Sequence, residues 1–356
     1  MRIVINAWRE LANELAGGAE ILVDHLAQGM LDRGHETHLV VGGPVGLREY
    51  NVASAGGVYG HYLRAPLVRR RVAPRADLVV DTAAGMTYCS PLLRRAPTIL
   101  LVHHLHTEQW AQWFSRPVAA MGRRFESDFV PMVYRRCLVV AVSESTADGL
   151  ERIGIDRSRI RIVRNVADPP PPGPPIERST EPLFFALGRM VPHKRMRTLV
   201  DIWAQVQPIV GGRFVIGGDG PERKSVEALN IPGLEVLGRV DDETKHRLFD
   251  QAWFLVHGAS HEGWGVVITE AASHGTPCLA FDVPGVRDAV VNESTGVLAA
   301  DSDQFIKYWI DLAGDRAKME RYGRAARLRS AEFSATATLD SFEQVALEAI
   351  DRSPKR

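Results

Sequence analysis

The sequence is poor in cysteine, in long apolar runs and in net charge. Its 356 residues include three cysteines, Cys89, Cys137 and Cys278, which stand too far apart to form a CxxC pair. This spacing argues against a cysteine-based zinc site or a redox dithiol. Free thiols in a reducing compartment are the simpler interpretation.

The absence of long apolar runs, of a signal peptide and of net charge further limits which class of protein this can be. No stretch reaches the roughly 18 apolar residues of a membrane-spanning helix, and the start, MRIVINAW, does not resemble a signal peptide. The 43 Lys+Arg residues balance the 43 Asp+Glu residues, so no overall basic field argues for nucleic acid. We therefore expect a cytoplasmic protein that does not bind nucleic acid.

Short, nearly continuous apolar runs recur along the chain, as buried parallel strands do. They are RIVINA, ETHLVVGG, ADLVVDT, TILLVHH and CLVVAVS in the first half, and PLFFALGR, RFVIGGDG, LEVLGRV, WFLVHGA and TPCLAFD in the second. Segments with helical spacing of apolar residues lie between them, and further helices are expected near 303–330 and 338–352. The order strand, helix, strand predicts an α/β protein with parallel sheets.

A proline-rich segment, PPPPGPP at 169–175, separates the two series of strands. Proline fixes φ and lacks an amide donor, so this segment predicts a stiff connection between domains. We expect a Rossmann-like N-terminal domain over 1–168, a linker over 169–179, and a second Rossmann-like domain over 180–335. A last helix over 336–356 is expected to cross back to the first domain. The default ligand site is the cleft between the domains, at the carboxyl ends of the strands.

The stretch HEGWGVVITE at 261–270 carries two glutamates at one such strand end. Glycines make helix improbable just after Glu262, so this acid is expected in a loop. A helix is expected over Val266–Ser273, where Gly275 and Pro277 follow. Glu270 would then lie one turn inside that helix.

The free amides at the start of this helix, from Gly265 to Val267, would form a site for phosphate. A carboxylate beside bound phosphate would repel it, so both acids are expected to reach hydroxyls. A sugar on one side of a diphosphate and a ribose on the other would supply them. The alternative is an exposed loop acid and a second acid favoured by the helix dipole.

Other strand ends carry cations and glycines. LGRMVPHK places Arg189 just after a strand and Lys194 five positions later, where two cations could neutralise a diphosphate. Glycine turns follow at GGDGP (217–221) and GRV (238–240), and GGAE (17–20) offers a third in the first half. Each of these could also be a plain turn or a solvated surface.

Taken together, these motifs resemble the signature of the family 4 retaining glycosyltransferases, which have two Rossmann-like domains in the GT-B architecture. The matching pieces, in chain order, are GGAE, RGHE, VSESTADGL, GR…K, GGDGP and the pair Glu262–x7–Glu270 within EGWG and TEAASHGTP. The resemblance extends from Met1 to about Leu298. It implies that the first domain binds the acceptor and the second binds a nucleotide-sugar donor.

Residue by residue, the resemblance implies a donor site. Arg189 and Lys194 would hold the diphosphate, Glu262 the sugar hydroxyls and Glu270 the ribose, and His103 would lie near the reacting sugar. The further donor-binding positions are Gly17, Gly18, Gly188, Gly218, Arg239, Val240, Gly263, Trp264, Gly265, Val266 and Val267.

The position of the histidine remains open at this stage, because His104 and His106 are close rivals of His103 in LVHHLHTEQW. Three histidines in four positions could also suggest a metal. Neighbouring side chains of an extended segment point to opposite faces and no carboxylate pattern accompanies them, so we expect no metal and no cofactor.

The expected reaction is metal-independent transfer of a hexose-type sugar, from a UDP-sugar in preference to a GDP-sugar, to a hydroxyl of a glycolipid, saccharide or natural product. The segment 61–75, with five arginines and no acid, could contact the inner face of a membrane, or be a solvated basic surface. Alternatives are a GT-B nucleotide-sugar epimerase and a non-catalytic nucleotide-sugar-binding protein. An NAD-dependent oxidoreductase is disfavoured because no G-x-G-x-x-G follows the first strand.

Overall fold

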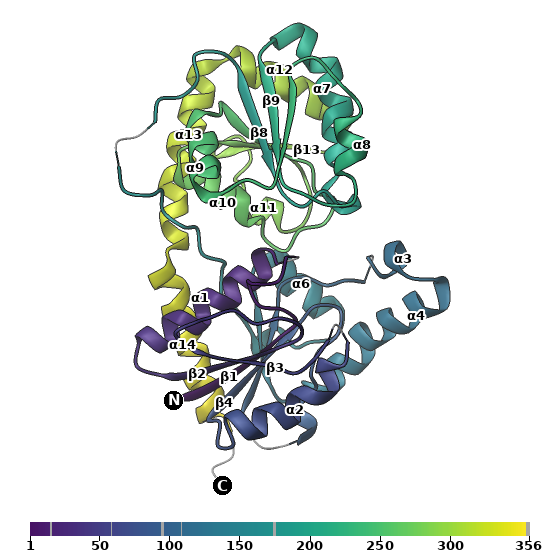
Figure 1. Ribbon diagram of the computed structural model, residues 1–356, viewed down its shortest axis with the longest axis vertical. Helices are drawn as coiled ribbons and strands as arrows, with labels where there is room; N and C mark the ends of the chain where they lie inside the picture. The colour runs from purple at the N-terminus through teal and green to yellow at the C-terminus, as the bar shows by residue number, and fades with distance from the viewer. Residues whose placement is uncertain (15, 58, 94–95, 108, 174–175, 354–356) are drawn as a thin grey trace. The chain divides into compact units, whose positions relative to one another are not determined.

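The chain folds into two compact units, shown in the computed structural model of Figure 1. The structure describes residues 1–14, 16–57, 59–93, 96–107, 109–173 and 176–353, so Pro174 and Pro175 of the expected linker lie outside it. Unit 1 comprises Met1–Val166 and Ala335–Arg356, and unit 2 comprises Ala167–Ser334. Each unit is an α/β structure built on one parallel sheet.

The sheet of unit 1 has seven parallel strands in the order β3-β2-β1-β4-β5-β6-β7. Its strands are β1 Arg2–Ala7, β2 Glu36–Val41, β3 Asn51–Ser54, β4 Leu78–Ala83, β5 Thr98–Val102, β6 Leu138–Ala141 and β7 Ile160–Ile162. The central strands are almost wholly buried because helices cover both faces, which explains their continuous apolar runs. The strand order reverses between β1 and β4, so loops leaving these strands diverge at a topological switch point.

The helices of unit 1 connect these strands. They are α1 Gly18–Asp32, α2 His61–Val72, α3 Trp110–Trp113, α4 Arg116–Arg124, α5 Val130–Val133, α6 Glu144–Arg152 and α14 Ala335–Asp351, and a π-helical turn covers Phe125–Phe129. The last helix, α14, packs against α1, β4 and β5. Arg33 pairs with Glu343 of α14 at 2.6 Å, and Arg161 pairs with Glu348 at 2.6 Å. The end of the chain is therefore part of unit 1.

Unit 2 has six parallel strands in the order β10-β9-β8-β11-β12-β13. The strands are β8 Leu183–Leu187, β9 Arg213–Gly217, β10 Leu234–Gly238, β11 Phe254–His257, β12 Cys278–Phe281 and β13 Gly296–Ala299. The helices are α7 Met196–Val210, α8 Arg223–Glu227, α9 Asp242–Gln251, α10 Val266–Ser273, α11 Val286–Ala289, α12 Ser302–Gly314 and α13 Arg316–Ser330. Here the order reverses between β8 and β11, which pair directly with each other.

The core of unit 2 is aromatic around this reversal. Phe184 of β8 and Phe254 of β11 lie 4.7 Å apart between ring centroids, and Trp309 meets Phe184 edge to face at 5.2 Å. All three side chains are fully buried. Aromatic packing of this kind adds to the stability gained from burial alone, and it holds β8 and β11 as a rigid base for the loops that follow them.

The helix expected near 303–330 is two helices. Asp315 lies between α12 and α13, and its side chain accepts the amide of Lys318 as the N-cap of α13. A capping carboxylate satisfies an amide that the helix leaves free, so it starts a new helix inside a continuous apolar pattern. Among the residues described, no helix is long and apolar enough to cross a membrane.

Candidate functional site

The loops after β8 and β11 bring Lys194 and Glu262 together. Lys194 ends a 3₁₀ turn, Pro192–Lys194, that follows β8, and Glu262 lies between β11 and α10. The two loops are joined by the amide of Ser260, which donates to the carbonyl of His193 at 2.8 Å. Nζ of Lys194 and Oε2 of Glu262 form an ion pair in which both side chains are 17% exposed.

A histidine that carried no role in the sequence analysis completes this cluster. His257 is the last residue of β11, and its Nε2 lies 3.4 Å from Oε2 of Glu262. Burial alone would raise the pKa of Glu262, but the Lys194 charge and the His257 imidazole outweigh it and hold the pKa well below its usual range. The Glu262 carboxylate is therefore ionised and oriented before any ligand binds.

The glycine bend after Glu262 is tightly packed. Gly265 caps α10 with φ 88°, a left-handed conformation that favours glycine. Gly285 supports the bend from behind, because a Cβ there would lie 2.3 Å from the carbonyl oxygen of Glu262. Trp264 is 2% exposed and meets Phe333 edge to face at 4.8 Å. Its side chain therefore belongs to the core and is not available to a ligand, whereas Val266 and Val267 are partly exposed.

Glu270 lies in α10, one turn after Glu262's bend, and it too has a lysine partner. Nζ of Lys245 on α9 is 3.1 Å from Oε1 of Glu270 and 3.0 Å from Oδ1 of Asp242. Burial raises the pKa of Glu270, and the Lys245 charge partly offsets that effect. The sequence predicts that both acids bind ligand hydroxyls. In the structure each carboxylate also pairs with a lysine, Glu262 with Lys194 and Glu270 with Lys245.

Of the predicted glycines Gly188 and Gly218, Gly218 is required by the close approach of two loops, whereas a Cβ at Gly188 would meet only Cε of Met196, at 3.3 Å. The amide of Gly188 donates to Gly217 at 3.1 Å, and the amide of Gly218 donates to Gly238 at 2.6 Å. A Cβ at Gly218, where φ is 123°, would lie 1.9 Å from the carbonyl oxygen of Gly188. These contacts fix the position of the loop after β8, which carries the exposed Arg189.

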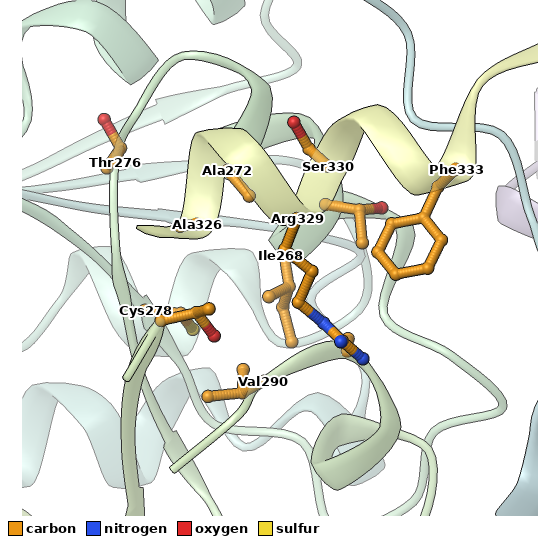
Figure 2. A pocket seen from close by; sticks show the side chains of 12 residues that line it. Ile268, Ala272, Thr276, Cys278, Val290, Ala326, Arg329, Ser330 and Phe333 are labelled. Atoms are coloured by element: carbon orange, nitrogen blue, oxygen red, sulfur yellow. The ribbon is translucent and has the colours of Figure 1, made fainter. Parts of the chain in front are cut away.

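Arg239 and Val240 follow β10 and line an open pocket of about 370 Å³. The pocket runs beside β9, β10 and α9 and is lined in part by Arg213, Glu235 and Arg247. A second cavity of about 10 Å³ lies among α10, α13 and β12 (Figure 2). The smaller cavity has room for about one water molecule, so it is no substrate site.

In unit 1, Gly17 and Gly18 stand at the start of α1. The amide of Gly17 donates to Oε2 of Glu20 at 2.8 Å, so the acid of the GGAE motif closes the helix end as a capping residue. This use of Glu20 was not foreseen, although an acid three residues after an N-cap is its usual sequence signal.

The three histidines follow β5 and differ in their surroundings. Burial, with smaller effects from His104 and His106, lowers the pKa of His103 to about 3, so His103 is neutral at physiological pH. His104 and His106 lie with ring centroids 4.0 Å apart, and the amide of His106 donates to buried Glu126 at 2.7 Å. No group of three or more His, Cys, Asp or Glu side chains within the described part of the chain is arranged to hold a metal ion.

Known families match both halves of the chain. Residues 16–169 match the family described as "Glycosyltransferase Family 4", and residues 174–329 match "Glycosyl transferases group 1". The chain is 26% identical over 342 residues to the 2-deoxystreptamine N-acetyl-D-glucosaminyltransferase of Streptomyces fradiae, covering 82% of this chain and 80% of that protein. It is 20% identical over 351 residues to the N-acetyl-alpha-D-glucosaminyl L-malate synthase of Bacillus anthracis, covering 87% and 88%.

Solved structures share the fold. HepE of Anabaena, solved in complex with UDP and glucose, superposes with a TM-score of 0.78 at 17% identity, covering 98% of this chain and 100% of that one. Sucrose-phosphate synthase of Thermosynechococcus elongatus gives a TM-score of 0.82 at 19% identity, covering 99% and 100%. These similarities confirm the two Rossmann-like domains and the GT-B architecture. The chain belongs to the family 4-like glycosyltransferases, enzymes that transfer a sugar from a nucleotide sugar.

Proposed function

We propose that this enzyme transfers a hexose-type sugar from a nucleoside-diphosphate sugar to a hydroxyl acceptor, with retention at the anomeric carbon and without a metal ion. The observation that carries the proposal is the meeting of Lys194 and Glu262 at the ends of β8 and β11. A cation for phosphate and a carboxylate for hydroxyls lie side by side at the switch point, where open parallel sheets bind ligands.

The proposed roles follow from charge and position. Arg189 and Lys194 hold the diphosphate and offset the charge that develops as it leaves, the task a metal ion performs elsewhere. Glu262 accepts hydrogen bonds from sugar hydroxyls, and Glu270 accepts them from the ribose. His103, which burial keeps neutral, is proposed to act near the reacting sugar. The amides at the start of α10 receive phosphate.

Retention is proposed to occur by front-face reaction. The acceptor oxygen forms its bond to the anomeric carbon on the face from which the diphosphate departs, and its proton passes to the leaving phosphate oxygen. Lys194 and His257 both engage Glu262, which favours a role in binding over one as a nucleophile. The enzyme then acts by positioning and charge stabilisation.

A UDP-sugar is the favoured donor, supported by the complex of HepE with UDP and glucose. A GDP-sugar is the rival donor, because the chain is 29% identical over 148 residues to a GDP-mannose-dependent alpha-mannosyltransferase of Mycolicibacterium smegmatis. Glycolipids, saccharides and natural products are the proposed acceptor classes. The natural-product class is supported by the relative from Streptomyces fradiae, whose name specifies 2-deoxystreptamine.

Thermal stabilisation tests the donor site. Purified protein would be melted with UDP, GDP, ADP and NAD, and a ligand at 100 times its dissociation constant adds about 2.7 kcal/mol to stability. We expect one nucleoside diphosphate to raise Tm, and Glu270→Gln, which keeps the shape but removes the charge, to weaken the effect. Stabilisation by NAD alone, or by no nucleotide, would refute the assignment. Product analysis with and without acceptors separates transfer from epimerisation.

We also propose a peripheral membrane contact, at the inner face of a membrane, through segment 61–75. Leu63 and Leu67 on α2 are 84% and 60% exposed. Arg69 is buried and donates to Oγ of Ser90 at 3.2 Å, so it does not join this surface. The exposed arginines of the segment are Arg64, Arg70, Arg71 and Arg75.

An exposed apolar pair among basic residues and no acids suits anionic lipid headgroups. The test is sedimentation with phosphatidylcholine vesicles that contain or lack phosphatidylglycerol. We expect binding only to the anionic vesicles, and loss of binding in Leu63→Glu. The matched control is Leu328→Glu, at a leucine of unit 2 that is 78% exposed. Equal binding of both variants would exclude this surface.

A further inference from the structure

Helices α9 and α10 are joined at two points by neighbouring polar side chains. Lys245 of α9 meets Glu270 of α10 with 3.1 Å between Nζ and Oε1. The next residue of α9, His246, meets His274 with 2.9 Å between Nδ1 and Nε2. Glu270 and His274 are four positions apart and therefore share one face of the α10 segment. Two adjacent residues on one helix thus fix two residues, one turn apart, on the other.

The contact between His246 and His274 is held in place by a third side chain, that of Asp250. Nδ1 of His274 lies 2.7 Å from Oδ1 of Asp250, and the His274 side chain is 1% exposed. Asp250 follows His246 by four positions on α9, so His274 is held between two residues of the same helix face. An acceptor at Nδ1 fixes the tautomer and the ring orientation of a histidine, which aims its Nε2 at His246.

The contact between Lys245 and Glu270 affects the pKa of the Glu270 carboxyl group. Burial raises the pKa of Glu270, and the charges of Asp168 and Asp242 raise it further. Lys245 is the group facing Glu270 that lowers this pKa. It also occupies Oε1 and leaves Oε2 to a ligand. The Glu270 side chain is 12% exposed, so little water is available to replace the lysine.

We propose that Lys245, fixed on α9 by the Asp250–His274–His246 chain, is a positioning residue that presents Glu270 as an ionised acceptor for a ribose hydroxyl. This inference rests on the proposed assignment of Glu270 to the ribose. Lys245 does not touch the nucleotide itself; it acts through the carboxylate that does.

The test compares nucleotides that differ only in ribose hydroxyls. Affinities for UDP and for 2′,3′-dideoxy-UDP would be measured by calorimetry at pH 8, or for the GDP pair if GDP is the nucleotide that stabilises the protein. In the unmodified enzyme we expect the dideoxy compound to bind roughly 10-fold more weakly or worse, because it leaves Oε2 of a mostly buried carboxylate without a hydrogen-bond donor. In Lys245→Met we expect the two compounds to bind within about 2-fold of each other.

Controls separate positioning from a general loss of structure. Lys224→Met, at an exposed lysine of α8, should keep full discrimination, and Lys245→Arg should restore it at least in part. His274→Asn should reduce discrimination by loosening α9, while leaving the affinity for pyrophosphate unchanged. If Lys245→Met does not fold, Lys245→Arg and His274→Asn carry the comparison.

The pH dependence of UDP binding separates an electrostatic role of Lys245 from a role in packing alone. Without Lys245 the pKa of Glu270 would lie still higher, so lowering the pH should weaken UDP binding by Lys245→Met. The unmodified enzyme should be less affected. Full discrimination in Lys245→Met would overturn the positioning role alone. Absence of discrimination in the unmodified enzyme would overturn the ribose assignment of Glu270 itself.

Discussion

Lys194 and Glu262 form an ion pair that links the loops after two neighbouring parallel strands. Each side chain is 17% exposed, so the charges compensate each other in a site with little water. In the proposed donor site, a nucleotide sugar would therefore meet an ion pair that is already neutral. The phosphates and hydroxyls of the donor would then interact with two side chains that already neutralise each other.

Replacing Lys194 by Met should lower kcat by orders of magnitude, because the leaving diphosphate loses a cation. The structure adds a stability cost of roughly 1–3 kcal/mol, since Glu262 keeps only His257 beside it in a mostly buried position. Activity assays and urea denaturation would measure the two effects. The double variant Lys194→Met/Glu262→Gln should recover stability without recovering activity. Near-normal turnover in the single variant would contradict the proposed role.

Chelation should leave the rate unchanged, because Arg189 and Lys194 are proposed to supply the positive charge at the diphosphate. The measurement is initial rate after dialysis against EDTA, with a UDP-sugar as donor. A rate abolished by EDTA and restored by Mg²⁺ would show that a metal ion takes part.

Gly218→Ala should destabilise the enzyme by several kcal/mol, because φ is 123° there and a Cβ would meet the Gly188 carbonyl oxygen at 1.9 Å. Gly314→Ala is the matched control, since a Cβ at the end of α12 has nothing within 4 Å. Thermal melting of both variants tests the comparison. Equal Tm values would mean that the two loops can separate freely.

Stability should fall at mildly acidic pH through two histidines of unit 1, the buried His103 and the partly buried His106. Burial lowers the pKa of His103 to about 3 and that of His106 to about 4. Below the ordinary value of 6.5 the unfolded chain takes up protons that the folded chain refuses, so each histidine costs up to about 1.4 kcal/mol per pH unit. Glu126 acts in the opposite sense, since burial raises its pKa to about 7 and the folded state takes up a proton first.

Between pH 6.5 and 4.5 the stability gained through Glu126 offsets the loss through one of the two histidines. The net loss of stability is therefore up to about 1.4 kcal/mol per pH unit, the contribution of a single histidine. Urea denaturation at several pH values would measure it. His103→Gln should make the dependence less steep over this range. An unchanged slope in His103→Gln would show that this histidine is not buried in its neutral form.

The sequence allows the strand ends and their charges to be predicted, because parallel strands end at one sheet edge and glycine marks the bends. Helix α10 begins and ends where Gly265 and Gly275 predict. The partners of the acids could not be predicted in this way. Lys245 lies 25 residues before Glu270, and its contact depends on how two helices pack. Arg69 has the same sequence context as its exposed neighbours, and only the packing of α2 turns it inward.

The membership of α14 in unit 1 has a consequence for how the protein is made. Residues 335–356 belong to unit 1 but are synthesised after the whole of unit 2. Until they emerge from the ribosome, Arg33 and Arg161 lack their glutamate partners, and Leu339 does not yet cover Gly29 of α1. Unit 2 is one continuous segment and can fold during translation. Unit 1, which begins before unit 2 in the chain, can therefore be completed only after unit 2 has been translated.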